Sequence, residues 1–226
     1  MITTVVFDLD DTLYDEIDYC RSGLAAVARF IVTFSTCPCA DDAFACLWRH
    51  FLAGNRMRTF NAALDELGIA YDEHRITQLV EVYRNHRPDI ALPSDSRRTL
   101  DALTDRYTLA LLTDGFLPAQ RLKVQALGIE PRLEAIVYTE DLGRTFWKPS
   151  PAGFERLAQI LATAPDRMAY VGDNEEKDFI APNRLGMLTI RVLRPRRLHR
   201  ESSDQPDAKA TLETGRIEDL PSLLVR

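Results

Sequence analysis

The residues best suited to chemistry in this chain are acids gathered in two short stretches. Residues 8–18 hold six acids and no base, and residues 173–178 hold four acids and one lysine, in a chain whose formal net charge is −6. Like charges packed this closely cost free energy unless a cation joins them. The two stretches are therefore either solvated faces or parts of a metal site.

The first stretch opens with the pair Asp8 and Asp10 in the run DLDDT. Residues two apart in an extended segment share a face, so both carboxylates can point into one site. One could then act as a nucleophile and the other as an acid or base. Taken alone, the pair favours a solvated loop with an Asx turn, because Asp-x-Asp is a common pattern.

The second stretch begins at Asp173, directly after Gly172, and ends at Asp178. Two carboxylates at this spacing can come from a strand end and the first turn of the next helix. Mg²⁺ takes one or two protein carboxylates together with water. Acids in a first helical turn also stabilise the helix dipole, which explains Glu175 and Glu176 well but explains an acid at a strand terminus less well.

Two further polar residues stand at the ends of predicted elements. Thr113 follows an apolar run and offers a hydroxyl donor, and Lys148 is a cation fixed before Pro149. Each by itself is explained equally well by a helix cap or a surface charge. A functional role becomes more plausible if the fold brings Thr113 and Lys148 close to the two acidic stretches.

The elements that must position these side chains are short apolar runs that predict buried parallel strands, at residues 2–7, 107–112, 135–138, 168–171 and 187–193. Helix-period segments separate the later runs, which predicts right-handed βαβ units. In such sheets chemistry gathers at the carboxyl ends of the strands. An α/β fold would therefore bring both acidic stretches to one edge.

Residues 14–93 interrupt this alternation of strands and helices. They contain no strand-like run but several helical segments, at residues 17–33, 41–52, 57–67 and 71–85. About 80 residues are too many for one crossover. We interpret them as a helical subdomain placed over the strand ends, with residues 1–13 and 94–226 forming the core.

The chemically suited segments occur in an order that resembles the haloacid dehalogenase-like (HAD) hydrolase superfamily. FDLDDTLYDE resembles its first motif, LLTDG its second, Lys148 in FWKPSP its third and VGDNEEKD its fourth. The resemblance covers nearly the whole chain. It implies a Rossmann-like parallel sheet with strand order 3-2-1-4-5 and an inserted α-helical bundle cap, as in the helical-cap, phosphatase-type members.

The resemblance also implies catalytic roles. Asp8 is expected to attack phosphorus and become an aspartyl-phosphate. Asp10 is expected to protonate the leaving oxygen and then to activate the hydrolytic water. Thr113 and Lys148 are expected to bind the phosphoryl oxygens.

By the same resemblance, Mg²⁺ is the expected cofactor. Asp8, the backbone carbonyl of Asp10 and Asp173 are expected to hold it, with Asp178 ligating through water or orienting Lys148. A dianionic phosphate cannot approach a bare carboxylate cluster, so a metal ion and a lysine would cancel the repulsion.

Substrate contacts are expected from the second and third motifs and from cap-entry and cap residues: Thr113, Asp114, Gly115, Lys148, Tyr14 and Arg56. Asp114 is a departure, because the family most often has Asn after the Thr or Ser of the second motif. It adds a negative charge close to the expected phosphate site.

These expectations combine into Mg²⁺-dependent hydrolysis of a small phosphomonoester, such as a sugar phosphate, a nucleotide or another metabolite. The alternatives are a phosphomutase with the same aspartyl-phosphate, a 2-haloacid dehalogenase, and a catalytically silent binding protein with this fold. Dehalogenases of the family usually lack the second aspartate and need no metal, so Asp10 and Asp173 favour phosphoryl chemistry.

Composition narrows the partners. The acidic balance, with a pI of about 5.3, disfavours a nucleic-acid partner. The N-terminus has no basic n-region, and the longest apolar stretch, residues 24–34, is short and contains Arg29. We expect a cytoplasmic protein with no membrane partner, acting as a monomer or homodimer.

The cysteines offer a second metal hypothesis. Cys37, Cys39, Cys46 and His50 could in principle form a Cys₃His zinc site. They lack the paired spacing of a zinc knuckle, which favours reduced thiols in buried or loop positions.

Overall fold

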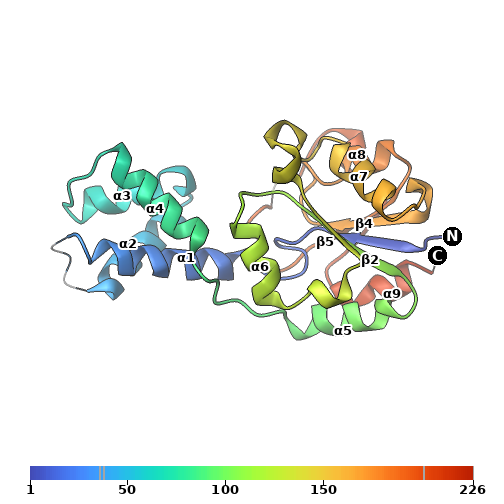
Figure 1. Cartoon of the computed structure of the whole chain (residues 1–226), viewed down its shortest axis with the longest axis horizontal. Helices are drawn as coiled ribbons and strands as arrows, with labels where there is room; N and C mark the ends of the chain where they lie inside the picture. Colours follow the sequence, from blue (N-terminus) through green and yellow to red (C-terminus); the bar gives the residue numbers. More distant parts are fainter. Residues whose placement is uncertain (36, 38, 201, 226) are drawn as a thin grey trace. The chain divides into compact units, whose positions relative to one another are not determined.

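The computed structural model describes residues 1–35, 37, 39–200 and 202–225. The chain divides into two compact units, one formed by Met1–Ile17 with Ala91–Arg226 and the other by Asp18–Ile90 (Figure 1). The first unit is built on a sheet, whereas the described residues of the second form helices and loops. That the second unit acts as a cap stays a prediction.

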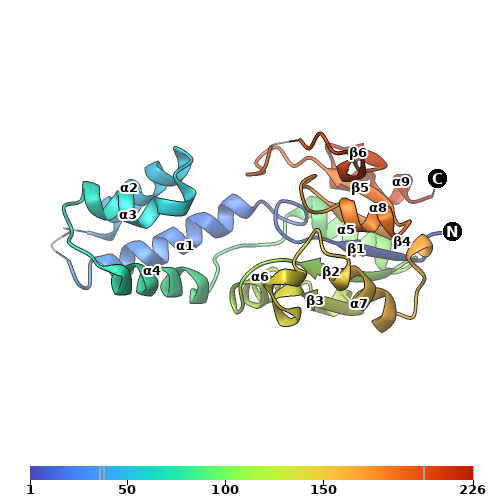
Figure 2. The ribbon, with the colours of Figure 1, turned by 90° about the horizontal axis from the view of Figure 1, so that it is seen from above.

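The first unit contains a six-stranded sheet in which all neighbouring strands are parallel, in the order β3-β2-β1-β4-β5-β6 (Figure 2). This confirms the predicted α/β class and the order 3-2-1-4-5, to which β6 adds an edge strand. The strands are β1 (Thr4–Phe7), β2 (Thr108–Thr113), β3 (Ala135–Tyr138), β4 (Met168–Gly172), β5 (Leu188–Val192) and β6 (Leu212–Thr214).

Helices cover both faces of this sheet, as crossovers between parallel strands require. On one face lie α7 (Ala152–Ile160) and α8 (Ile180–Arg184), and on the other lie α5 (Ser94–Thr104) and α9 (Leu220–Leu223) (Figure 1). The crossover from β2 to β3 contains α6 (Ala119–Leu127). The central strands β1 and β4 are therefore buried along their whole length, and the chain segments that follow them leave the sheet at its carboxyl end.

The core of the first unit is apolar and closely packed around the central strands. Val6, Leu112 and Tyr170 come from three neighbouring strands and pack with Phe154 of α7 and with Phe179. The rings of Phe154 and Tyr170 meet edge to face, with centroids 4.9 Å apart. This packing fixes Tyr170, whose hydroxyl reaches the site described below.

The strand ends meet at one edge of the sheet because the strands are parallel. Phe7, the last residue of β1, is in register with Val171 in β4. Asp8 and Asp173 therefore leave adjacent strands at nearly the same height, and Thr113 ends β2 on the other side of β1. The predicted chemical residues thus start from three neighbouring strands.

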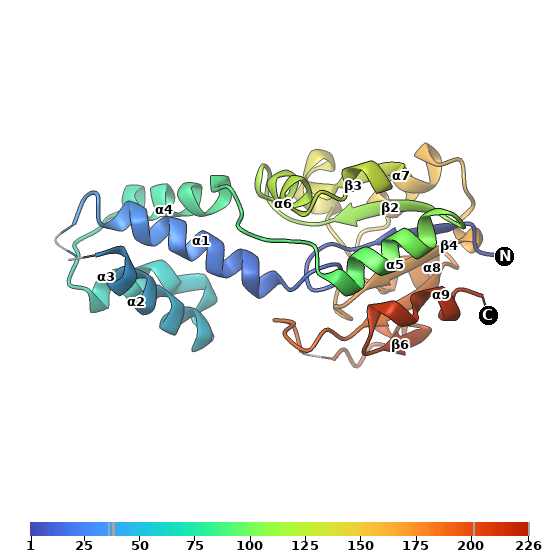
Figure 3. The ribbon, with the colours of Figure 1, turned by 90° about the horizontal axis from the view of Figure 1, so that it is seen from below.

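The second unit is a helical bundle (Figure 3). Its helices lie close to the predicted segments and are α1 (Glu16–Ile31), α2 (Ala40–Leu52), α3 (Thr59–Glu66) and α4 (Glu73–Asn85), with a 3₁₀ turn at Arg56–Arg58. Within the described residues, every helix is too short or too polar to cross a membrane.

Close helix contacts hold this bundle together. A Cβ at Gly23 of α1 would lie 2.5 Å from a ring carbon of Tyr83 in α4, so glycine allows the two helices to approach. Tyr83 in turn packs against Phe60 of α3, with ring centroids 6.1 Å apart. At the start of α4, the Asp72 side chain caps the helix by accepting from the N–H of Arg75 at 2.8 Å.

Candidate active site

Lys148 joins the two acidic stretches at the carboxyl edge of the sheet. Its Nζ donates to Asp8 Oδ1 at 2.6 Å, to Asp178 Oδ1 at 2.7 Å and to the Tyr170 hydroxyl at 3.0 Å. All of these side chains are buried. Burial opposes the charge of Lys148, but Asp178 and Asp8 outweigh it and hold the pKa of the lysine well above its ordinary value.

Asp178 has both carboxylate oxygens engaged. Besides accepting from Lys148, it accepts from the backbone N–H groups of Asp173 at 3.2 Å and Asn174 at 2.9 Å. A Cβ on Gly172 would lie 2.7 Å from Asp178 Oδ2, so only glycine leaves room for this approach. Burial would raise the pKa of Asp178, yet the neighbouring lysines and these hydrogen bonds lower it. The geometry suits a residue that orients Lys148.

Carboxylate oxygens of Asp8, Asp173 and Asp178, here called the carboxylate triad, lie within 4.8 Å of one another. Asp8 Oδ2 and Asp173 Oδ2 are buried and have no hydrogen-bond partner among the described residues. Burial raises the pKa of Asp8 to about 6, and burial with the nearby carboxylates raises the pKa of Asp173 well above its ordinary value. A hard divalent cation requires carboxylate oxygens that are not already hydrogen-bonded, and burial makes such oxygens costly without a cation. The triad therefore fits Mg²⁺.

Asp10 is held by Tyr14 of the first motif and by two side chains of α6, which lies outside the recognised motifs. Lys123 Nζ donates to its two carboxylate oxygens at 2.8 and 2.9 Å, and Gln120 Nε2 donates to Oδ2 at 3.0 Å. The Tyr14 hydroxyl donates to Oδ1. Burial would raise the pKa of Asp10, but Lys123, Tyr14 and Gln120 together lower it. Asp10 is therefore an ionised carboxylate in this geometry.

Gln120 also links Asp10 to the end of β2. Its Nε2 donates to Thr113 Oγ1 at 2.7 Å, and the Gln120 side chain lies against Gly115. A Cβ on Gly115 would lie 2.8 Å from that side chain, and its φ of 138° favours glycine. The backbone at Gly115 thus makes room for the link.

Sequence reasoning missed Gln120 and Lys123, although a signal was present. Both lie in the buried stripe of α6. Charged and amide side chains within the apolar stripe of an amphipathic helix need buried partners. That pattern could have indicated a polar site beneath this helix.

Asp114, which replaces the usual Asn, is engaged in holding the third motif. Its Oδ1 accepts from the Thr139 hydroxyl at 2.7 Å, and both oxygens accept from the backbone N–H of Lys148, at 3.2 and 3.1 Å. The carboxylate therefore links the ends of β2 and β3 to the segment that carries Lys148. A direct contact of Asp114 with substrate stays a prediction.

Lys177 is a second cation of the site that sequence reasoning left unassigned. Burial and Lys148 oppose its charge, but Asp8, Asp178 and Asp114 outweigh them and raise its pKa. Its charge in turn favours the ionised form of Asp8. The acidic stretch around Asp173 therefore brings its own positive charge.

The remaining predicted residues separate into two groups. Tyr14 is buried and contacts Asp10 rather than an open surface. Arg56 lies in the second unit, where its guanidinium lies over the Phe51 ring, 5.8 Å from the centroid. The roles of both in substrate binding stay predictions.

The fold and the site define a class of protein: a Rossmann-like α/β protein with carboxylates and lysines converging at the carboxyl ends of its strands. A family model of haloacid dehalogenase-like hydrolases matches residues 2–186. The chain belongs to this family, which confirms the resemblance carried by its motifs.

Relatives and solved structures agree with this assignment. The chain is 28% identical over 200 residues to a glyceraldehyde 3-phosphate phosphatase of Methanopyrus kandleri, covering 86% of this chain and 85% of the relative. It is 28% identical over 169 residues to a phosphoserine phosphatase of Thermus thermophilus, covering 73% and 63%. The crystal structure of a 2-haloacid dehalogenase from Pseudomonas syringae pv. Tomato DC3000 superposes with a TM-score of 0.67 at 24% identity, covering 100% and 99%, and shares the fold.

Proposed function

We propose that the protein is a Mg²⁺-dependent phosphatase that hydrolyses a small phosphomonoester through an aspartyl-phosphate on Asp8. One observation carries this proposal. Asp8 has one oxygen held by Lys148 and the other buried without a partner beside an equally open oxygen of Asp173. A buried carboxylate between a lysine and a carboxylate oxygen that could share a cation with it is suited to receive a phosphoryl group.

The open oxygens of Asp8 and Asp173 are the proposed Mg²⁺ ligands, and the backbone carbonyl of Asp10 stays a proposed third. When bound, the ion would neutralise charge that develops on the phosphoryl oxygens. Asp178 would act through its contacts, since it orients Lys148 and binds the backbone at Asp173. Lys148 and Thr113 would bind the other phosphoryl oxygens.

The first step would form a bond between Asp8 and phosphorus while the bond to the leaving oxygen breaks and that oxygen takes a proton from Asp10. In the second step water would attack phosphorus and give its proton to Asp10, which frees Asp8 and releases inorganic phosphate. The ionised Asp10, held by Lys123, is in the form needed for this second step. In the first step Asp10 must carry a proton.

The relatives support a small phosphomonoester. Two of them are named for glyceraldehyde 3-phosphate and for phosphoserine, both compact monoesters. The structural neighbour named as a dehalogenase shows the fold alone, at 24% identity. The presence of both Asp10 and Asp173 supports phosphoryl transfer over carbon–halogen cleavage.

The test is release of inorganic phosphate from a panel of small phosphomonoesters and p-nitrophenyl phosphate, with and without millimolar Mg²⁺. Asp8→Asn should reduce turnover by more than about 1000-fold while the circular dichroism spectrum is kept. Asp166→Asn is the matched control, because this exposed aspartate precedes β4 at the opposite edge of the sheet. It should keep wild-type turnover.

Four results would overturn the proposal. They are full activity of Asp8→Asn, isomerisation of a sugar phosphate without phosphate release, metal-independent halide release from a 2-haloacid, and no turnover across the panel. The second indicates a phosphomutase, the third a dehalogenase and the last a silent binding protein.

A further inference from the structure

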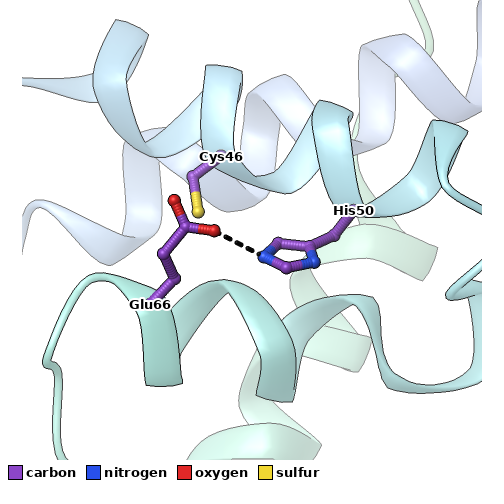
Figure 4. Close-up of side chains that lie close together, drawn as sticks. All are labelled: Cys46, His50 and Glu66. Carbon is purple, nitrogen blue, oxygen red and sulfur yellow. Dashed lines mark hydrogen bonds and ion pairs between the residues drawn. The ribbon is translucent and has the colours of Figure 1, made fainter.

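A second group of metal-binding side chains lies in the helical unit. Cys46 and His50 are four residues apart on α2 and so share a face of that helix, and Glu66 is the last residue of α3. Figure 4 shows their side chains converging between the two helices. One ligand atom from each lies within 4.8 Å of the others. These three residues are here called the Cys–His–Glu cluster.

The side chains of the cluster contact one another and the backbone of α3. His50 Nε2 and Glu66 Oε2 lie 2.9 Å apart, at hydrogen-bond distance, and the Cys46 thiol donates to the carbonyl of Ala63 at 3.7 Å. Cys46 is buried, whereas the side chains of His50 and Glu66 are 22% and 47% exposed. The thiol of the cluster is therefore buried, while the imidazole and the carboxylate face solvent, from which an ion could enter.

We propose that the Cys–His–Glu cluster binds a zinc-type transition-metal ion. Thiolate and imidazole are soft and borderline donors that suit zinc and disfavour Mg²⁺. Zinc places sulfur at about 2.3 Å and nitrogen or oxygen at about 2.0–2.1 Å, so tetrahedral ligand atoms stand roughly 3.3–3.7 Å apart. The ligand atoms lie within 4.8 Å of one another, so binding would require only small side-chain adjustments. Three protein ligands leave the fourth position for water.

Arg49 lies beside the cluster and is compatible with the ion. Its guanidinium is bonded to Glu66 Oε1 and lies 3.8 Å from Cys46 Sγ. His50 contacts the other oxygen, Oε2. An ion bound between His50 Nε2 and Glu66 Oε2 would leave the Arg49–Oε1 pair intact. Carboxylate ligands of metals are commonly held in this way by an outer hydrogen-bond donor.

The cysteines considered from sequence make other contacts. Cys37 Sγ lies 3.5 Å from the carbonyl of Cys39, and Cys39 Sγ lies 3.1 Å from Asp42 Oδ2. Of the four predicted ligands, the structure brings Cys46 and His50 together and adds Glu66. Glu66 is on another helix, so no local spacing pattern could have indicated it.

Cobalt(II) binding tests this proposal on the full chain, independently of any phosphatase activity. The chelator-treated protein would be titrated with Co²⁺ in millimolar Mg²⁺, following the thiolate-to-cobalt charge-transfer absorption. The carboxylate triad contains no sulfur, so this absorption reports a thiolate site alone. We expect it to saturate at one equivalent of Co²⁺ and to be displaced by one equivalent of Zn²⁺.

Variants assign the absorption to the cluster. Cys46→Ser should abolish it, and His50→Gln and Glu66→Gln should each weaken Co²⁺ binding by at least about tenfold. Cys20→Ser is the matched control, because Cys20 is a buried cysteine of the same unit outside the cluster. It should keep the absorption.

The absence of a charge-transfer band with the wild type would overturn the proposal. So would a band that survives Cys46→Ser, or one lost in the double variant Cys37→Ser/Cys39→Ser. Circular dichroism checks that each variant is folded. For a variant that fails to fold, cadmium-113 NMR of the wild-type protein decides, because a thiolate-bound ion has a chemical shift far from that of an all-oxygen site.

Discussion

Each of the two units brings three potential metal ligands within 4.8 Å of one another, yet the two groups differ in donor chemistry and burial. The carboxylate triad is wholly buried and made of hard oxygen donors. The Cys–His–Glu cluster mixes sulfur, nitrogen and oxygen and is open to solvent on one side. Proximity of ligands is thus the same in both, while the ion that each can hold is different.

Burial determines how much free energy each group would gain from binding a cation. In the triad two carboxylate oxygens are buried without a hydrogen-bond partner, and desolvation raises the pKa values of Asp8 and Asp173. In the cluster Glu66 is half exposed and already paired with Arg49 and His50. Without a cation, the triad carries unpaired buried carboxylate oxygens, whereas the Glu66 carboxylate of the cluster already has partners.

The largest expected effect comes from removing the cation of each group. Lys148→Met leaves Asp8 and Asp178 buried without their lysine, and loss of one partner of a buried ion pair costs about 3–5 kcal/mol. Arg49→Met breaks a pair whose side chains are 60% and 47% exposed, which costs about 1 kcal/mol or less. Urea unfolding of both variants without metal measures the difference. Equal losses of unfolding free energy would show that burial does not separate the two groups.

Metal addition should give the next largest effect. Ions that bind only the folded state stabilise it by about 2.7 kcal/mol at 100 times Kd. Mg²⁺ should therefore raise the melting temperature of the wild type and of Cys46→Ser alike, but not that of Asp173→Asn. Differential scanning calorimetry measures the shift. A Mg²⁺ shift that depends on Cys46 and not on Asp173 would reverse the assignment of hard and soft sites.

The same comparison explains what the sequence could predict. The carboxylate triad follows strand ends, and the carboxyl ends of neighbouring parallel strands must meet, so Asp8, Asp173 and Lys148 could be assigned to one site from motif order. The buried stripe of α6 could have indicated a polar site beneath that helix, but not that Lys123 pairs with Asp10, because the rotation of the helix depends on tertiary packing. The position of Glu66 next to Cys46 and His50 could not be predicted either, because it depends on how α2 and α3 pack. The orientation of Asp114 toward Thr139 likewise depends on side-chain contacts that no spacing rule describes.

Substitution of Lys123 tests whether a cation outside the triad sets the pKa of Asp10. Lys123→Met removes the cation that holds Asp10 ionised, so the pKa of Asp10 should rise and kcat should fall by about 10–100-fold. Because the proposed mechanism uses the base form of Asp10 for water attack, the acid limb of the kcat profile should move to higher pH. Lys123→Arg keeps the positive charge, so the acid limb of its kcat profile should return to the wild-type pH. A fall in kcat with an unmoved limb would mean that Lys123 acts on the fold alone.

The smallest expected effect is a dependence of Mg²⁺ stabilisation on pH. The pKa of Asp8 in the metal-free fold is raised to about 6, so the proton on Asp8 stabilises that fold at low pH. This contribution is fully present below the ordinary value of 3.8 and is lost as pH rises through about 6. A Mg²⁺ ion bound to Asp8 as proposed must displace that proton, so Asp8 alone should weaken the stabilisation by Mg²⁺ by about 1.4 kcal/mol for each pH unit below 6.

Melting curves with and without Mg²⁺ between about pH 5 and about pH 7.5 measure this dependence. Asp8→Ser serves as the comparison, since it removes one of the two buried carboxylates whose pKa is raised and leaves the other, Asp173, in place. Its smaller Mg²⁺ shift should vary less over this range. Cys46→Ser should follow the wild-type curve, because the Cys–His–Glu cluster takes no part in Mg²⁺ binding. A wild-type Mg²⁺ shift that stays constant from the acid to the neutral end would mean that Asp8 is not a ligand of the ion. Mg²⁺ would then have to bind through Asp173 without Asp8, the proposed nucleophile.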